Sequence, residues 1–164
     1  SQFEKVLLSM ADIEKSISET IRLIQSINNK AAIIFTVSPV RHLKDGFAEN
    51  QRSKSHLIAA IHNQVPSANY FPSYEIMMDE LRDYRFYADD LLHPNAMAIQ
   101  YIWERFVSVS MSPETVAVMQ EIESIQKALA HKPFHPDSES HSKFRSQLQQ
   151  KIAALQKRFA YIKF

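Results

Sequence analysis

A single glycine, Gly46, stands in a chain of 164 residues. Average glycine usage of ~7% would give about eleven. Glycine-rich phosphate loops, dinucleotide-binding fingerprints and glycine-flanked nucleophile elbows all need glycines at fixed positions, so these residues hold none of those sites. An α/β enzyme ordinarily uses glycine in such places. Either the chain is no such enzyme, or the glycine-bearing part of the enzyme lies outside this sequence.

Composition excludes several other classes of protein. Lysine and arginine number 19 against 18 aspartates and glutamates, for a net charge of +1, so the basic excess of a nucleic-acid-binding protein is missing. No apolar run approaches the roughly 18 residues that span a bilayer, and residues 1–5 do not make a signal peptide. The chain has no cysteine, which excludes disulfides and a cysteine nucleophile. We expect a cytoplasmic protein that binds neither nucleic acid nor membrane.

Two short apolar runs predict parallel strands. Residues 31–38 are continuously apolar, rich in β-branched residues and ended by Pro39, as in a strand buried on both faces. Residues 69–78 predict the second strand, with Pro72 making it irregular or placing it near an edge. A helix predicted over residues 53–65 joins the two strands, so the three elements form one right-handed crossover.

Helical periodicity marks the remaining elements. Isoleucines at spacings of four and three predict an amphipathic helix over residues 10–28. The polar residues 39–52 predict a long loop at a strand end, where function commonly lies. Residues 96–109 predict another helix. The last two helices, beginning near Ser112 and around Phe144, are joined by a short turn and predict an antiparallel hairpin.

These elements indicate a partial α/β domain over residues 1–110 and a C-terminal helical hairpin over residues 111–164. A two-stranded parallel ribbon leaves both edges open, and a stable sheet normally has more strands. We therefore expect the chain to be the C-terminal part of a larger α/β protein, or to complete its sheet with a second copy. The sheet edge and the hairpin are the two surfaces through which a homodimer would form.

A carboxylate and a histidine precede the helix predicted over residues 96–109. Asp90 lies three residues before His93, and Pro94 follows directly. Proline suits the first position of a helix, which would put His93 at or beside the N-cap, where the positive helix end disfavours the imidazolium. A nearby carboxylate fixes the tautomer, so the pair suits a general base and its orienting partner. Asp89 is the alternative carboxylate, and a plain helix cap is the alternative to catalysis.

Four blocks of the sequence carry a family resemblance: TVSPVRHLKDG at 36–46, YFPSYEI at 70–76, DELRDYRFY at 79–87 and HKPF at 131–134. Together they resemble the GSCFA family, a bacterial group related to the SGNH (GDSL-like) hydrolases. Several blocks in the correct order are more specific than one motif, and they cover nearly the whole chain.

The resemblance implies a fold and a set of roles. The fold is the C-terminal part of a three-layer, flavodoxin-like α/β parallel sheet, followed by the hairpin. In the SGNH group an Asp-x-x-His block supplies two members of a Ser–His–Asp triad, and those roles carry over to Asp90 and His93. The glycine–serine motif of the nucleophile and the oxyanion-hole blocks have no match here.

The resemblance therefore implies a fragment of a serine esterase that is inactive alone and needs no cofactor or metal. Its substrate would be a small-molecule or carbohydrate ester, for instance an O-acetylated sugar. The alternative function is a non-catalytic module that uses the hairpin for self-association or partner binding. Fold alone does not choose between them.

Other polar residues are also candidates for site residues. Arg41 and His42 lie on the strand-end loop and are candidates to bind an acyl or sugar oxygen of the substrate, the alternative being a solvated loop pair. Ser38 ends the first predicted strand, where a serine bonding the backbone is expected more often than a nucleophile. Three histidines gather around the hairpin turn without the spacing of a zinc site: His131, His135 and His141. In the helix predicted over residues 96–109, three aromatic residues are expected in the core: Tyr101, Trp103 and Phe106.

Overall fold

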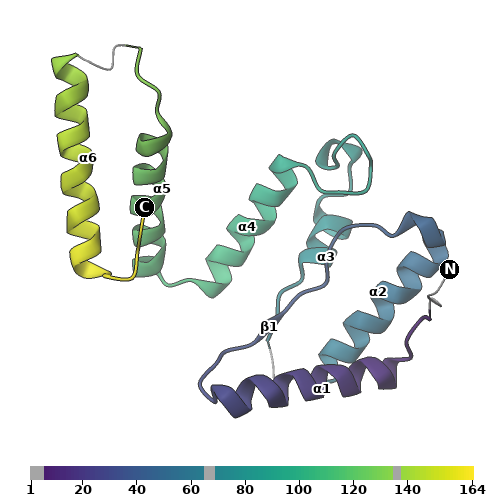
Figure 1. Cartoon of the computed structure of the whole chain (residues 1–164). Helices are drawn as coiled ribbons and strands as arrows, with labels where there is room; N and C mark the ends of the chain where they lie inside the picture. The colour runs from purple at the N-terminus through teal and green to yellow at the C-terminus, as the bar shows by residue number, and fades with distance from the viewer. Residues whose placement is uncertain (1–5, 65–68, 135–137) are drawn as a thin grey trace, which may run out of the picture. The chain divides into compact units, whose positions relative to one another are not determined.

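The computed structural model describes residues 6–64, 69–134 and 138–164. They form two compact units, Ser1–Ser108 and Val109–Phe164 (Figure 1). The elements of the first unit are, in chain order, α1 (Met10–Ile27), β1 (Ile34–Phe35), the 3-10 turn η1 (Leu43–Asp45), α2 (Phe47–His62), β2 (Asn69–Tyr70), α3 (Ser73–Glu75), the π-helical turn η2 (Ile76–Glu80), the 3-10 turn η3 (Tyr84–Phe86) and α4 (Ala96–Ser110). The second unit contains α5 (Pro113–Ala130) and α6 (Glu139–Arg158).

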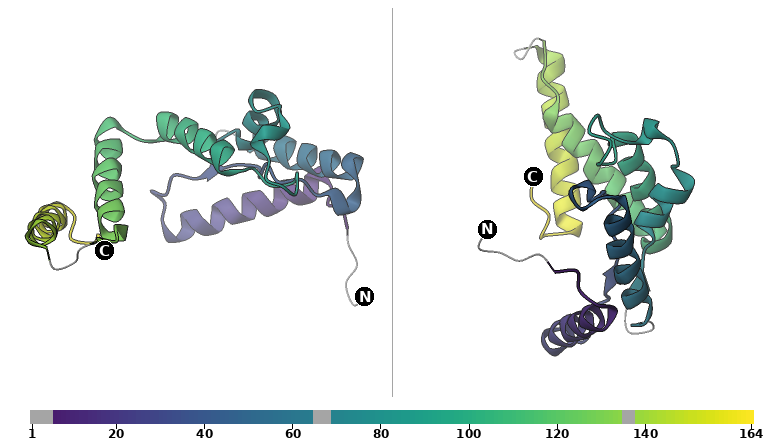
Figure 2. Two further views of the ribbon diagram at one scale, coloured as in Figure 1. Left: turned by 90° about the horizontal axis from the view of Figure 1, so that it is seen from above. Right: turned by 90° about the vertical axis from the view of Figure 1, so that its right-hand side faces the viewer.

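Helix α1 begins at a capping box. The Ser9 hydroxyl accepts a hydrogen bond from the Asp12 amide, and the Asp12 carboxylate accepts one from the Ser9 amide, which satisfies two donors of the first turn. Ile13, Ile17 and Ile21 are buried along one face, so the helix predicted from the isoleucine periodicity is confirmed. Helix α2 lies beside α1, as the views of Figure 2 also show.

The two strands pair in parallel, with Ile34 opposite Asn69 and Phe35 opposite Tyr70. The predicted parallel pairing is therefore confirmed, but the predicted strand lengths are wrong. The second strand ends before Pro72, which lacks the N–H that a ladder needs. Residues 73–80 then turn into α3 and η2 rather than continuing as a strand.

The core of the first unit is built from helix faces packed on the strand pair. Isoleucines of α1 and residues of α2 enclose Val37 and Tyr74 in one buried cluster. A second cluster joins η2 to α4 through Met77 and Ala98, both fully buried. Helical spacing in residues 74–81 places Tyr74 and Met77 on the buried side, which is why this segment folds as a helix and not as a strand.

The lone glycine begins α2. Gly46 has φ 88°, a left-handed conformation that glycine adopts without strain, and α2 starts at the next residue, Phe47. The loop predicted over residues 39–52 is therefore wrong in its second half, where η1 and the first turns of α2 are helical. Helix α2 begins six residues earlier than the helix predicted over residues 53–65. Val65 lies outside the described residues.

Helix α4 begins at Ala96, as predicted, so Pro94 does not occupy its first position. The Asn95 side chain accepts a hydrogen bond from the Ala98 amide and caps the helix, as asparagine does well. Pro94 pairs instead with Tyr87 in an isolated antiparallel bridge. The prediction that His93 sits at or beside the N-cap is therefore wrong, and the influence of the helix end on its ring weakens with that distance.

The second unit is an antiparallel pair of helices, α5 and α6, which run in opposite directions (Figure 1). Ser112 caps α5 ahead of Pro113, so the predicted start of α5 and the hairpin are confirmed. Helix α6 begins at Glu139 after the Ser138 cap, five residues before the start predicted around Phe144. Their shared core consists of Ile125, Leu148, Ile152 and Leu155.

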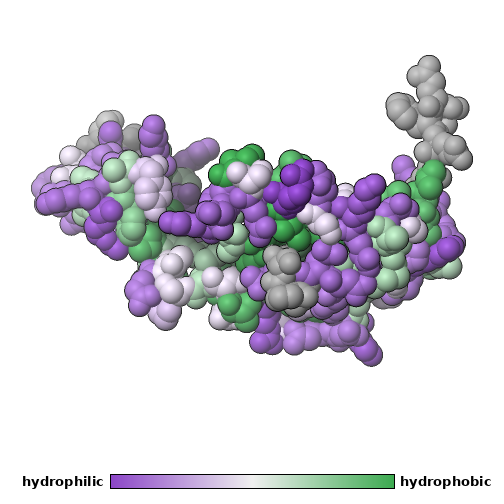
Figure 3. Space-filling model, turned by 90° about the horizontal axis from the view of Figure 1, so that it is seen from below, coloured by the Kyte–Doolittle hydropathy of each residue, from purple (hydrophilic) through white to green (hydrophobic). Residues whose placement is uncertain are grey.

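Hydrophilic residues prevail on the face drawn in Figure 3, with hydrophobic residues gathered in separate groups between them. Within the part of the chain that the structure describes, no helix is both long and apolar enough to cross a bilayer.

Candidate active site

The Asp90 and His93 side chains meet in a tight turn ahead of α4. Asp90 Oδ2 lies 2.6 Å from His93 Nδ1. The other carboxylate oxygen, Oδ1, accepts hydrogen bonds from the Leu92 amide at 2.9 Å and the His93 amide at 3.0 Å. The His93 side chain is 58% exposed and that of Asp90 46% exposed. One carboxylate thus fixes both the backbone of the turn and the orientation of the imidazole.

The same hydrogen bonds keep Asp90 ionised. The backbone amides of His93 and Leu92, followed by the His93 ring, lower the pKa of the Asp90 carboxyl to about 2. A carboxylate only accepts hydrogen bonds, so Nδ1 of the neutral imidazole carries the proton. The lone pair is then on Nε2, which is the arrangement of a general base.

Residue Leu91, at the centre of the turn, adopts a left-handed conformation with φ 58°. Such a conformation is strained for a residue other than glycine, asparagine or aspartate. The turn is closed by the Leu91 amide donating to Ala88 O at 2.9 Å and the Ala88 amide donating to His93 O at 2.8 Å. Surrounding contacts must hold this strain for the Asp90–His93 geometry to persist.

The structure places the other candidate residues around this turn in different ways. The Asp89 side chain is exposed, and the His93 ring bonds Asp90 rather than Asp89. Arg41 reaches the turn: its guanidinium donates to the Tyr87 hydroxyl at 2.9 Å and lies over the Tyr87 ring at 4.3 Å. The His42 side chain is exposed, and its backbone amide donates to Asn50 Oδ1 at 2.7 Å.

Ser38 bonds the backbone. Its hydroxyl accepts a hydrogen bond from the Val40 amide at 3.3 Å, and its carbonyl accepts one from Lys54 Nζ at 2.7 Å. Lys54 is only 2% exposed, and this burial lowers the pKa of its ammonium group. Ser38 therefore takes the role expected of a strand-end serine.

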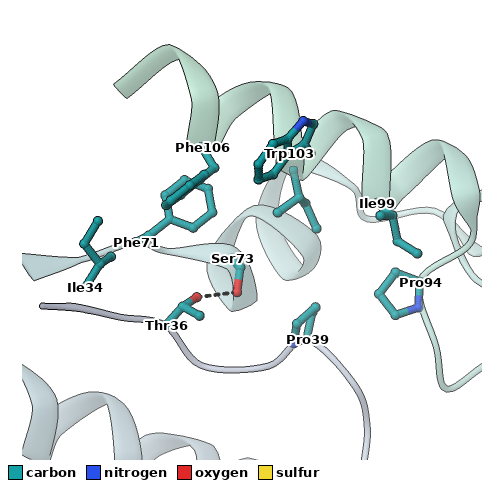
Figure 4. Close-up of a pocket in the computed structure, with 10 residues that line it drawn as sticks. Ile34, Thr36, Pro39, Phe71, Ser73, Pro94, Ile99, Trp103 and Phe106 are labelled. Atoms are coloured by element: carbon teal, nitrogen blue, oxygen red, sulfur yellow. Dashed lines mark hydrogen bonds between the residues drawn. The ribbon is translucent and has the colours of Figure 1, made fainter. Parts of the chain in front are cut away.

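An apolar groove of about 450 Å³ adjoins the turn at Pro94. Trp103 and Phe106 project from α4 on one side of the groove, and Thr36 and Pro39 lie on the opposite side (Figure 4). The groove is lined by Ile34, Thr36, Pro39, Phe71, Ser73, Pro94, Ile99, Ile102, Trp103 and Phe106.

Sequence periodicity did not reveal this groove. Trp103 is 45% exposed, so the prediction that it lies in the core is wrong. Its ring stacks on that of Phe106, with the centroids 5.7 Å apart, and the Phe106 ring meets the Phe71 ring edge-on, with the centroids 5.0 Å apart. The hydroxyls of Thr36 and Ser73 bond each other at 2.6 Å, and Ser73 also donates to the Val37 carbonyl. Helical spacing marks such residues as one face, but a core face and an open groove have the same spacing.

Histidines of the hairpin turn contact an aromatic ring. The ring centroids of His131 and His141 lie 5.9 Å and 6.1 Å from the ring centroid of Phe144. His135 lies outside the described residues. Over the residues that the structure describes, no group of three or more histidines and acidic residues is placed to hold a metal ion.

Two family models match the chain. The model of the GSCFA family matches residues 1–106, and the model described as GSCFA domain protein, C-terminal domain, matches residues 122–164. No curated protein and no solved structure matches the chain.

Proposed function

The chain belongs to the GSCFA family, and we propose that it carries the histidine–aspartate arm of an SGNH-type serine hydrolase. The observation that carries the proposal is the 2.6 Å contact between His93 Nδ1 and Asp90 Oδ2, in a turn that leaves both side chains about half exposed. An ionised carboxylate bound to Nδ1–H is the arrangement by which an acid orients a catalytic imidazole.

In the proposed reaction a serine outside these 164 residues attacks the carbonyl carbon of an ester. His93 Nε2 takes the proton of the serine hydroxyl and then gives it to the leaving alcohol. Asp90 stays ionised and stabilises the imidazolium that forms between the two steps. The serine ester is then hydrolysed by water, which His93 activates in the same way. The substrate is a small-molecule or carbohydrate ester such as an O-acetylated sugar.

The fold we propose is the C-terminal part of a three-layer parallel sheet, with its other strands outside residues 1–164. Supporting this, β1 and β2 are two residues each, shorter than an independent sheet sustains. Ile34 of β1 is also partly exposed beside the apolar groove. Parallel sheets are ordinarily covered on both faces.

Labelling with a fluorophosphonate tests the nucleophile and its base together. In the full-length protein we expect one serine to be labelled, and His93→Ala to reduce labelling and ester turnover about 10⁴-fold or more, since the members of a triad act as a unit. His131→Ala, a histidine of the second unit, is the matched control and should keep the parent rate.

Near-normal turnover in His93→Ala would refute the role of this residue. The 164 residues alone should not hydrolyse a p-nitrophenyl ester. Turnover by that chain that disappears in His93→Ala would contradict the proposal that the serine lies elsewhere.

A second candidate function is supported by the hairpin. Phe134 is almost fully exposed and Leu129 about half exposed near the turn between α5 and α6, and exposed apolar side chains of this kind mark contact surfaces when they gather. A non-catalytic module would use this end to bind itself or another protein. Light scattering tests self-association: a monomeric mass at high concentration would count against it.

A further inference from the structure

We infer that Arg41 is a positioning residue that holds the Asp90–His93 turn in its productive geometry. The inference rests on the proposed function for its kinetic consequence, but the geometry of the turn can be measured without any activity. It differs from the expectation drawn from sequence, in which Arg41 binds a substrate oxygen.

Arg41 donates hydrogen bonds to the Asp90–His93 turn and to one of its flanks. Its guanidinium donates to the Tyr87 hydroxyl at 2.9 Å and reaches the Leu91 carbonyl at 3.5 Å. Its backbone amide donates to the Leu92 carbonyl at 3.4 Å. Tyr87 and Pro94, which flank the turn, pair in an antiparallel bridge. Arg41 thus contacts one flank of the turn firmly and its apex by two longer bonds.

Buried polar side chains hold the segment that carries Arg41. Among the residues that the structure describes, the buried polar or charged side chains are Asn50, Lys54 and Ser73. All three bind the backbone of residues 37–42.

Asn50 Oδ1 accepts from the His42 amide at 2.7 Å, and Lys54 Nζ donates to Ser38 O at 2.7 Å. Ser73 Oγ donates to Val37 O at 2.8 Å. Burying a polar group is unfavourable unless its hydrogen bonds are made, so these three side chains fix the segment that carries Arg41.

The backbone of Leu91 is strained. Its left-handed conformation, φ 58°, persists only where neighbouring contacts over-determine it. Within the turn, the bonds of Asp90 and Ala88 close the backbone on itself. Arg41 supplies the contacts from a distant part of the chain, which fix the closed turn relative to the strand end.

The kinetic test separates positioning from substrate binding. In the full-length protein we expect Arg41→Gln to lower kcat about 10²-fold, because a displacement of about 1 Å at a catalytic group costs this much, with KM changed less than about twofold. Arg52→Gln is the matched control, because Arg52 lies on α2, eleven residues after Arg41, and its side chain is largely exposed beside Glu49. A raised KM with unchanged kcat would overturn the inference, since that pattern marks lost substrate binding.

A second variant tests the mechanism through Leu91. Asparagine adopts the left-handed conformation more readily than leucine, so Leu91→Asn should make the turn less dependent on Arg41. We expect the double variant Arg41→Gln, Leu91→Asn to recover at least several-fold of the kcat lost in Arg41→Gln. Strictly additive effects of the two substitutions would contradict a shared role.

Nitrogen NMR of His93 tests the geometry without a substrate. In the parent protein the proton resides on Nδ1, and in Arg41→Gln we expect a mixture of the two tautomers and altered amide shifts at Leu92 and His93. Arg52→Gln should leave these signals in place. If the tautomer and the amide shifts are the same in Arg41→Gln as in the parent, Arg41 does not position the turn, whether or not the protein proves to be a hydrolase.

Discussion

At the scale of single residues, Asp90 does two things that are usually divided between side chains. One oxygen accepts from two backbone amides, and the other binds the imidazole of His93. The spacing of three residues makes this possible, since the turn folds the chain back onto the aspartate that begins it. The carboxylate that shapes the turn is therefore also the one that orients the ring.

The pKa of Asp90 gives this arrangement a pH dependence. Its folded value, about 2, lies below the ordinary 3.8, so the carboxylate stabilises the folded turn above pH 3.8 and this contribution is lost as pH falls through about 2. We expect the amide signals of Leu92 and His93 to move toward unfolded positions over that range. NMR titration of the backbone amides measures this directly.

Neighbouring Asp89 provides the control for that titration. Asp90→Asn should remove the transition between pH 3.8 and 2 and disorder the turn at neutral pH, because an amide accepts from the two backbone donors more weakly than a carboxylate. Asp89→Asn, one residue earlier and exposed, should leave both the transition and the turn intact. If the transition is lost in Asp89→Asn but kept in Asp90→Asn, the titrating carboxylate is Asp89, and the prediction for Asp90 is contradicted.

At the scale of elements, the helices could be predicted well and the strands only in part. The helix over Met10–Ile27 has a capping box at one end and buried isoleucines along one face, so local and long-range signals agree. The apolar run at residues 31–38 carries strand signals, yet it pairs only over Ile34–Phe35. How many residues pair depends on what lies beside a strand, which its own sequence does not contain.

Residues 73–80 were mispredicted for a different reason. Their aromatic and apolar residues suit a strand as well as a short helix, and it is burial of Tyr74 and Met77 on one side that selects the helix. The candidate site follows the same division. The Asp90–His93 contact follows from a spacing of three residues, whereas the Arg41 side chain contacts residues 46 and 50 positions away, and no local pattern predicts those contacts.

Helix α1 offers a matched test of its buried face. Ile17 is 9% exposed in the core of the first unit, and Ile27, on the same helix, is 90% exposed. We expect Ile17→Ala to lower the free energy of unfolding by about 2–4 kcal/mol through lost burial and the cavity left behind. Ile27→Ala should change it by no more than about 0.5 kcal/mol. Urea denaturation followed by circular dichroism measures both, and equal effects would contradict the packing of α1.

At the scale of the whole molecule, the chain consists of two units with separate cores. In the first, α1 and α2 pack on the strand pair, while in the second α5 and α6 share a core of their own. The candidate active site and the apolar groove both lie in the first unit. The proposed hydrolysis and the proposed association through the hairpin would thus involve different units, and each can be tested by substitutions in one of them.

The groove provides a reporter for the proposed completion of the sheet. Trp103 is the only tryptophan of the 164 residues and lines the groove at 45% exposure. If strands outside these residues cover the groove, the Trp103 emission should shift to shorter wavelength and resist acrylamide in the full-length protein, because apolar cover excludes both water and quencher. The emission of Trp103 is obtained as the difference between the parent and Trp103→Phe, in the full-length protein and in the 164-residue chain. Equal quenching in the two proteins would mean that the groove stays open, and the sheet would then not be completed on this face.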